Sequence, residues 1–220
     1  MAQNPADSQI AEEIVKAALH HVPFDGWRMT TLEMAAEECG YDSAQVHNAL
    51  PDGVDDAIAL YAQMADRDMV AAFEALEEAP AKTHLKIRAL ILCRLEEAMR
   101  HKQTVSKTMA YLAQPQHAAK ASKMLYNSVD LMWRTAGDDA TDVSFYSKRA
   151  TLAAVYSATL LAFLSDDSGD MAKTEAFLDR RLRDVSQIPK VTKPAKAAVS
   201  KAASLVGGIA SQLISRGRPF

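Results

Sequence analysis

Histidines and carboxylates are the residue types in this chain that could support metal or acid–base chemistry, and the sequence has six histidines. Helical di-iron carboxylate sites place a glutamate three residues before a histidine, so that both ligands project from one face of the helix. Glu97 stands four residues before His101, a spacing typical of a contact on a helix surface. The histidines that lack an acid at the required spacing are His20, His21, His47, His84, His101 and His117. The sequence therefore predicts no metal site.

Motifs for nucleophiles and nucleotides are also missing, since no CxxC, HExxH, GxSxG, P-loop or GxGxxG pattern occurs. The acids Asp138, Asp139 and Asp142 are too sparse for a calcium loop, and their place before an apolar helix favours capping. Cys39 and Cys93 lie far apart on helical patterns, which is typical of buried thiols in a reducing compartment. We therefore expect a protein that is not an enzyme, with no catalytic residue and no cofactor.

The elements that must position any functional residue are predicted to be helices throughout. Eight Gly and eight Pro are few for 220 residues, and no strand-like alternation of useful length occurs. We expect Pro23 and Gly26 to end the first helix and Thr30 or Thr31 to cap the second. The expected helices are 8–22, 30–39, 43–50, 52–73, 81–101, 104–113, 115–135, 142–164 and 170–185.

The first four predicted helices have a helix-turn-helix layout, which resembles the N-terminal domain of TetR-type regulators. A DNA-binding domain neutralises phosphates with Lys and Arg, but neither residue type occurs from Thr30 to Asp66. The candidate recognition helix offers only Gln45, His47 and Asn48 as base-reading groups. The acids of this window are Glu33, Glu37, Glu38, Asp42, Asp52, Asp55, Asp56 and Asp66. We therefore expect a regulator scaffold that binds no nucleic acid, and keep a ligand-sensing transcriptional regulator as the alternative.

The charge is distributed unevenly along the chain. Residues 189–220 hold six of the 25 basic residues and no acid, so that residues 1–188 hold 19 basic residues and all 28 acids. Apolar residues line one face of a predicted helix from Lys196 to Ser215, and a basic amphipathic helix of this kind can lie in a membrane interface. A disordered tail that keeps the chain in solution is the alternative. The predicted membrane-binding residues are Lys196, Lys201, Leu205, Val206, Ile209 and Leu213. We predict three parts: 1–79, like a helix-turn-helix; 80–188, a helical bundle; and 189–220, a basic tail that docks on anionic lipid.

The first 16 residues have neither a basic n-region nor an apolar h-region, so we expect no targeting segment. The longest uncharged apolar stretch, residues 150–165, is 16 residues long, which is short of the roughly 20 that span a bilayer. We expect a cytoplasmic protein, peripheral on the inner membrane of a bacterium.

The stretch from Val129 to Tyr156 is the most informative part of the chain. A tryptophan, Trp133, ends one apolar helix, an Ala-Gly-Asp break follows, and the next helix carries the uncharged residues 150–165. Most helices with apolar residues along one face use that face to pack against the protein core. A large aromatic side chain near a helix end also anchors partners, so both interpretations stay open.

This stretch resembles the coenzyme Q biosynthesis protein nine family, the lipid-binding auxiliary proteins of ubiquinone biosynthesis. The resemblance covers roughly residues 10–186, with a weaker match at His21-Val22-Pro23 and Gly26-Trp27. It is carried by Asp130, Met132-Trp133, Ala136-Gly137-Asp138, Thr141-Asp142, Tyr146, Arg149-Ala150, Leu152-Ala153-Ala154, Tyr156, Phe177-Leu178, Arg181 and Asp184.

The resemblance implies a TetR-like homodimer that has lost DNA binding. It would enclose an isoprenoid or a ubiquinone intermediate, dock on the membrane through its C-terminal helix, and present the lipid to the di-iron demethoxy-ubiquinone hydroxylase. The implied partner-binding residues are Leu125, Val129, Asp130, Met132 and Trp133. The candidate lipid-binding residues are Leu90, Ile91, Met109, Leu152, Val155, Tyr156, Leu160, Leu161 and Phe163. Leu131 and Arg134-Thr135 are departures that could alter the partner surface.

Overall fold

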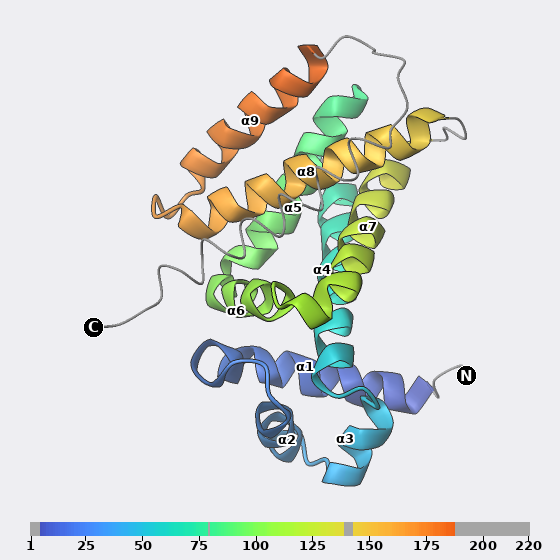
Figure 1. Ribbon diagram of the computed structural model, residues 1–220, viewed down its shortest axis with the longest axis vertical. Helices are drawn as coiled ribbons and strands as arrows, with labels where there is room; N and C mark the ends of the chain where they lie inside the picture. Colours follow the sequence, from blue (N-terminus) through green and yellow to red (C-terminus); the bar gives the residue numbers. More distant parts are fainter. Residues whose placement is uncertain (1–4, 79, 139–142, 188–220) are drawn as a thin grey trace. The chain divides into compact units, whose positions relative to one another are not determined.

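The computed structural model of the chain describes residues 5–78, 80–138 and 143–187 (Figure 1). Within these ranges all regular structure is helical, which confirms the predicted all-α class. The likeness to TetR-type regulators stays a prediction. The elements are α1 (Pro5–Asp25), α2 (Met29–Glu38), α3 (Ser43–Ala49), α4 (Val54–Glu74), α5 (Thr83–Met99), α6 (Lys102–Leu112), the 3-10 turn η1 (Pro115–His117), α7 (Ala118–Thr135), α8 (Val143–Ser165) and α9 (Ala172–Gln187).

The described residues group into two compact units, and α4 and α5 contribute to both. Unit 1 holds residues 5–68 and 97–112, and unit 2 holds the described residues of 69–96 and 113–187. This grouping does not follow the predicted division at residue 79, because α6 packs with the N-terminal helices. The indole Nε1 of Trp27 donates a hydrogen bond to Thr108 Oγ1 on α6 at 2.8 Å. The predicted tail, 189–220, lies outside the described residues.

Unit 1 is built on α1, which buries one face of small and aliphatic side chains against α2, α3 and α6. The expectation that Pro23 ends this helix is wrong, since α1 runs to Asp25. Pro23 has no N–H to donate to the Leu19 carbonyl, and Thr104 Oγ1 on α6 donates to that carbonyl instead, at 3.3 Å. Gly26, with φ 74°, then ends the helix as expected.

The second and third helices begin differently from each other. The residue before α2 is Arg28, and its side chain forms no capping hydrogen bond. Thr31 lies inside the helix and donates to the Gly26 carbonyl at 2.9 Å, so the expected cap at Thr30 or Thr31 is wrong. Asp42 caps α3 through a capping box with Gln45, with both hydrogen bonds at 2.9 Å.

Unit 2 places α8 between α7 and α9, with part of α5 alongside (Figure 1). Asp166 closes the turn from α8 to α9, since its carboxylate accepts hydrogen bonds from the backbone and hydroxyl groups of Ser168 and Thr174. Arg88 on α5 binds α9 through Asp179 at 2.6 Å and Glu175 at 3.0 Å. These contacts join α9 to α5 and to the end of α8, and so help to position the segment in which α7 ends and α8 begins. Among the described helices, none combines the length and the apolar character needed to cross a bilayer.

Candidate functional site

The end of α7 is fixed by a Schellman motif, the helix ending in which a glycine adopts a left-handed conformation. Gly137 has φ 87° and donates to the Arg134 carbonyl at 2.9 Å. The Asp138 N–H donates to the Trp133 carbonyl, also at 2.9 Å. The predicted Ala-Gly-Asp break is therefore confirmed, and it turns the chain directly after the tryptophan.

A buried ion-pair network joins this helix end to the start of α8. The Arg149 side chain, 4% exposed, donates to Asp130 Oδ1 at 2.6 Å and to Asp138 Oδ2 at 3.3 Å. Lys148 Nζ donates to the other oxygen of Asp138 at 2.5 Å, and Arg134 adds a 2.7 Å pair to Asp130. The guanidinium carbon of Arg149 also lies 3.4 Å from the centre of the Phe145 ring.

The network explains the lowered pKa of Asp138 and corrects one expectation. Burial alone raises the pKa of Asp138, but Lys148 and Arg149 outweigh that effect through hydrogen bonds and charge, so the pKa lies below its ordinary value. Asp138 was expected to cap a helix and instead pairs with these two cations. Asp139 and Asp142, expected to act with it, lie outside the described residues.

Trp133 lies at the edge of this network. Lys148 Nζ is 5.6 Å from the centre of the indole ring, within the range of a cation–π interaction. The indole Nε1 is buried, and no described residue accepts a hydrogen bond from it, although the residue as a whole is partly exposed. Buried polar groups normally have a partner, so this buried N–H is an exception among the described residues.

The predicted partner-binding residues do not all reach that surface. Val129 and Met132 are fully buried and support α7 from inside unit 2. Asp130 is 8% exposed and is engaged by Arg149 and Arg134. Leu125 and Trp133 are the two members of this set with partly exposed side chains. The assignment of the set to a partner stays a prediction.

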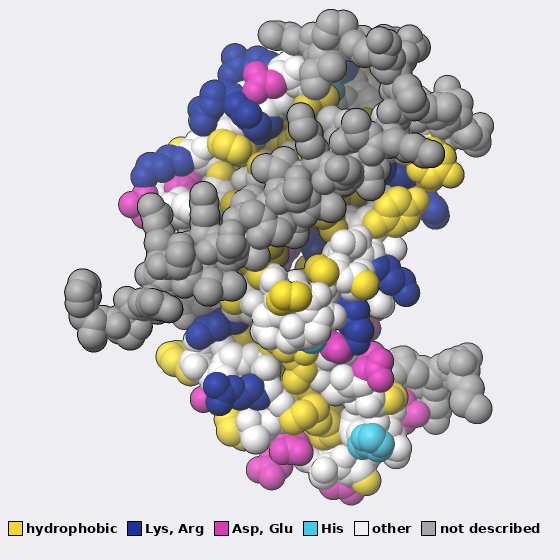
Figure 2. All heavy atoms as spheres, viewed as in Figure 1, with side chains coloured by type: hydrophobic (Ala, Val, Ile, Leu, Met, Phe, Trp, Pro, Cys, Tyr) yellow, Lys and Arg dark blue, Asp and Glu magenta, His cyan; other side chains and the backbone are white. Residues whose placement is uncertain are grey.

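Two exposed aromatic residues nearby are absent from the predicted partner-binding set, although Tyr146 is among the residues that carry the family resemblance. Tyr126 is 47% exposed and lies seven residues before Trp133, which places both on one face of α7. Tyr146, near the start of α8, is 67% exposed and packs edge-on against Phe145. Figure 2 shows hydrophobic side chains at the surface where α7 ends and α8 begins. The spacing of Tyr126 from Trp133 could have found the first of these residues.

Most of the predicted lipid-binding residues are buried residues of unit 2. Leu160 and Leu161 are partly exposed, and Met109 is a partly exposed residue of unit 1. The Nε of Arg94 on α5 donates to Tyr156 Oη on α8 at 3.3 Å, which joins the two predicted walls. The buried members are Leu90, Ile91, Leu152, Val155, Tyr156 and Phe163. Their role in lipid binding stays a prediction, and the predicted membrane-binding residues, 196–213, lie outside the described residues.

Metal ligands do not cluster in the part of the chain that the structure describes, where no three His, Cys, Asp or Glu side chains could hold one ion. Both cysteines are free thiols. Burial, with a smaller contribution from Glu96, raises the pKa of the Cys93 thiol above its ordinary value. This thiol is therefore a weak nucleophile and contributes to packing.

The fold and the site together define an all-α protein with an ion-paired helix end and, beside it, the helix α8, whose residues 150–165 carry no charge. The family model described as COQ9 matches residues 118–189, which contain the whole of α7, α8 and α9. The chain is 28% identical over 210 residues to the ubiquinone biosynthesis protein COQ9, mitochondrial, of Rattus norvegicus. The matched residues cover 93% of this chain and 66% of that protein.

Two further relatives carry the same name. The Drosophila melanogaster protein is 32% identical over 184 residues, or 81% of this chain and 56% of the relative. The Homo sapiens protein is 28% identical over 214 residues, or 93% of this chain and 65% of the relative. These matches confirm the resemblance to the COQ9 family that the sequence carries. The chain spans 56–66% of the lengths of these relatives.

Proposed function

We propose that this chain is a non-enzymatic lipid-binding protein of ubiquinone biosynthesis. It binds an isoprenoid or quinone intermediate at a membrane surface and presents it to the di-iron demethoxy-ubiquinone hydroxylase. The observation that carries the proposal is the COQ9 family match over residues 118–189, because this segment holds both the Trp133 surface and the uncharged residues of α8. The assignment to ubiquinone biosynthesis rests on the names of the relatives.

The lipid-binding part of the proposal depends on desolvation. Residues 150–165 carry no charge, and apolar surface removed from water contributes about 25 cal/mol per Å². Each 100 Å² of polyprenyl chain covered by the protein thus stabilises the complex by roughly 2.5 kcal/mol. Leu160 and Leu161 of α8 are partly exposed, so some of their apolar surface meets solvent. A bound hydrocarbon chain would cover this surface.

The partner-binding part depends on α7, whose first ten residues bury no side chain. Trp133 and Tyr126 combine large apolar rings with polar groups, a combination common at the energetic centres of protein interfaces. The Arg149 network holds the helix end in place, so the surface is formed before the partner arrives.

A transcriptional regulator is the weaker alternative. The acids Glu33, Glu37 and Glu38 on α2 and its C-terminal end, with Asp42 before α3, are all exposed. A duplex approaching these helices would meet negative charge, and no Lys or Arg stands between residues 30 and 66 to neutralise its phosphates. No observation on unit 1 favours DNA binding over this repulsion.

Substitution of Trp133 tests the proposal. Trp133→Lys adds a charge beside Lys148 and removes the aromatic anchor, so we expect the affinity for purified hydroxylase to fall by at least tenfold, which corresponds to about 1.4 kcal/mol. Asn127→Lys is the matched control, because Asn127 is exposed on α7 and is offset from Trp133 around the helix. It adds the same charge and should bind as the parent chain does.

Tyr126→Lys keeps the test decisive if Trp133→Lys disturbs the helix end, because Tyr126 is 47% exposed and outside the ion-pair network. Circular dichroism establishes whether each variant is folded. Equal hydroxylase binding by both folded variants and by the Asn127→Lys control would refute the partner-binding role.

A further inference from the structure

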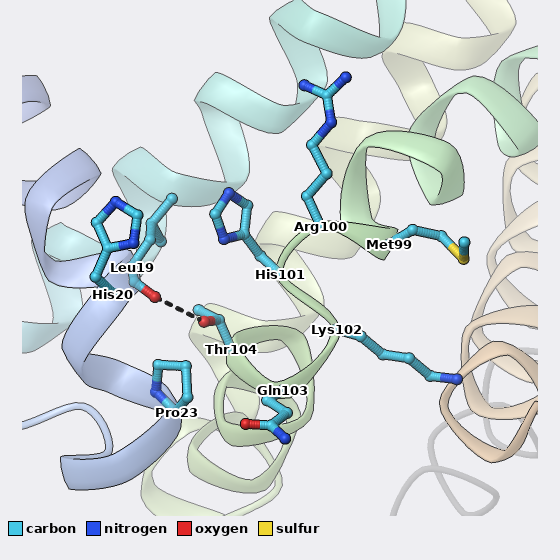
Figure 3. Close-up of a pocket in the computed structure, with 9 residues that line it drawn as sticks. All are labelled: Leu19, His20, Pro23, Met99, Arg100, His101, Lys102, Gln103 and Thr104. Carbon is cyan, nitrogen blue, oxygen red and sulfur yellow. Dashed lines mark hydrogen bonds between the residues drawn. The ribbon is translucent and has the colours of Figure 1, made fainter. Parts of the chain in front are cut away.

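Unit 1 contains a pocket of about 370 Å³ that is separate from the site described above. One side is formed by Leu19, His20 and Pro23 of α1, and the other by residues 99–104, from the end of α5 to the first turn of α6 (Figure 3). The volume lies within the range of roughly 300–1,000 Å³ found for ligand pockets. The pocket is therefore large enough to hold a small molecule or the polar end of a larger one.

The residues that line this pocket are strongly biased toward positive charge. Arg100 and Lys102 are cationic, and His20 and His101 can become so. No aspartate or glutamate occurs among the described lining residues. Glu97 pairs with Arg100 at 3.4 Å, from one turn earlier on α5. This lining stands out in a chain whose net charge is −3.

The two histidines form a pair across the pocket, as Figure 3 shows. Their ring centres lie 6.4 Å apart, with the rings nearly perpendicular. Burial lowers the pKa of His101 below its ordinary value, and the neighbouring charges of His20 and Arg100 lower it further, against a smaller opposing effect of Glu97. An anion placed between these groups would relieve the repulsion and favour protonated His101.

The remaining lining is apolar or neutral. Leu19, Pro23 and Met99 supply hydrocarbon surface, and Gln103 supplies an amide. The Thr104 hydroxyl is held by the Leu19 carbonyl, which Pro23 leaves without an intrahelical donor. The pocket thus offers several donors for one anion and a short apolar wall for whatever carries it.

We propose that this pocket binds the phosphate group of an anionic lipid. A guanidinium, an ammonium and two imidazole rings match the charge and the several acceptor oxygens of a phosphate, and Leu19, Pro23 and Met99 contact the adjoining hydrocarbon. The site lies in unit 1, apart from the predicted lipid wall of α8, and the proposal does not depend on quinone binding.

The test follows the histidine ring resonances of the full chain by nuclear magnetic resonance, with inorganic phosphate and short-chain phosphatidic acid as separate probes. We expect both probes to shift the resonances of His20 and His101 and to raise the pKa of His101. Tighter binding of phosphatidic acid identifies a lipid phosphate, and equal binding overturns the lipid source in favour of free phosphate compounds.

Charge-matched variants separate this pocket from general attraction. Arg100→Gln with Lys102→Gln should weaken binding by at least tenfold, equivalent to about 1.4 kcal/mol. Arg28→Gln with Lys107→Gln removes the same charge from exposed positions of unit 1 outside the pocket lining and should leave binding unchanged. Equal weakening by the two double variants, or unshifted histidine resonances with both probes, would overturn the proposal.

Discussion

Replacement of Arg149 by methionine should destabilise unit 2 strongly, because it removes the one cation that both buried carboxylates share. The side chains of Arg149, Asp130 and Asp138 are 4%, 11% and 5% exposed. Removing one partner from a buried ion pair costs about 3–5 kcal/mol, since it leaves an uncompensated charge in the interior. Arg134 still pairs with Asp130 at 2.7 Å and Lys148 with Asp138 at 2.5 Å. We therefore expect the lower end, about 3 kcal/mol.

The assay is urea unfolding followed by circular dichroism, with thermal unfolding as a second measurement. For a chain of 150–250 residues, 1 kcal/mol shifts the Tm by about 2–4 °C, so Arg149→Met should lower the Tm by roughly 6–12 °C. Arg134→Met is the matched control. It removes the same charge from the same Asp130, but the Arg134 side chain is 70% exposed, and exposed pairs contribute about 0–1 kcal/mol.

A compensating variant tests the cause of the loss. Arg149→Met combined with Asp130→Asn and Asp138→Asn removes the buried charges together, and we expect it to recover most of the lost stability. A loss of under about 1 kcal/mol for Arg149→Met, or a loss equal to that of Arg134→Met, would refute the reasoning that the network is buried and holds the helix end.

Three further outcomes are expected. Deletion of residues 190–220 should abolish flotation of the chain with anionic liposomes, and unchanged flotation would reject the docking role of the tail. Hydrogen bonds from Ser168 and then Thr174 hold the pKa of Asp166 below its ordinary value, so Asp166→Asn should lower stability at neutral pH. The difference in stability between the variant and the parent chain should shrink as pH falls below about 4 toward the pKa of Asp166 in the folded state. Urea unfolding at several pH values measures this difference. A difference that does not change with pH would show that the carboxylate does not stabilise the fold. A gel-shift assay at low salt with DNA from upstream of the coding region should show no complex, because residues 30–66 contain no Lys or Arg; a specific shift would favour the regulator.

The helical class and most helix limits could be read from the sequence, because periodic apolar residues and glycine stops act locally. Gly137 illustrates this, since its left-handed conformation alone ends α7. Pro23 illustrates the failure of a local rule, because Thr104, 81 residues further on, satisfies the carbonyl that the proline leaves unpaired. Tertiary contacts of this kind have no signature in a sequence window.

The candidate site was predicted less completely than the fold. The family resemblance implied Leu125, Val129, Met132 and Trp133 as partner-binding residues, but it could not separate the buried Val129 and Met132 from the partly exposed Leu125 and Trp133. That distinction depends on which side of α7 meets α8. The role of Arg149 was equally hidden, since its pairing with residues 19 and 11 positions earlier needs the Gly137 turn.

Native mass spectrometry of the purified full chain, followed by solvent extraction of whatever it carries, shows directly whether the chain binds an isoprenoid lipid. We predict an isoprenoid or quinone bound at a constant ratio to the chain, and uptake of added quinone by protein from which lipid has been removed. A chain that is isolated empty and also takes up no quinone would contradict this prediction.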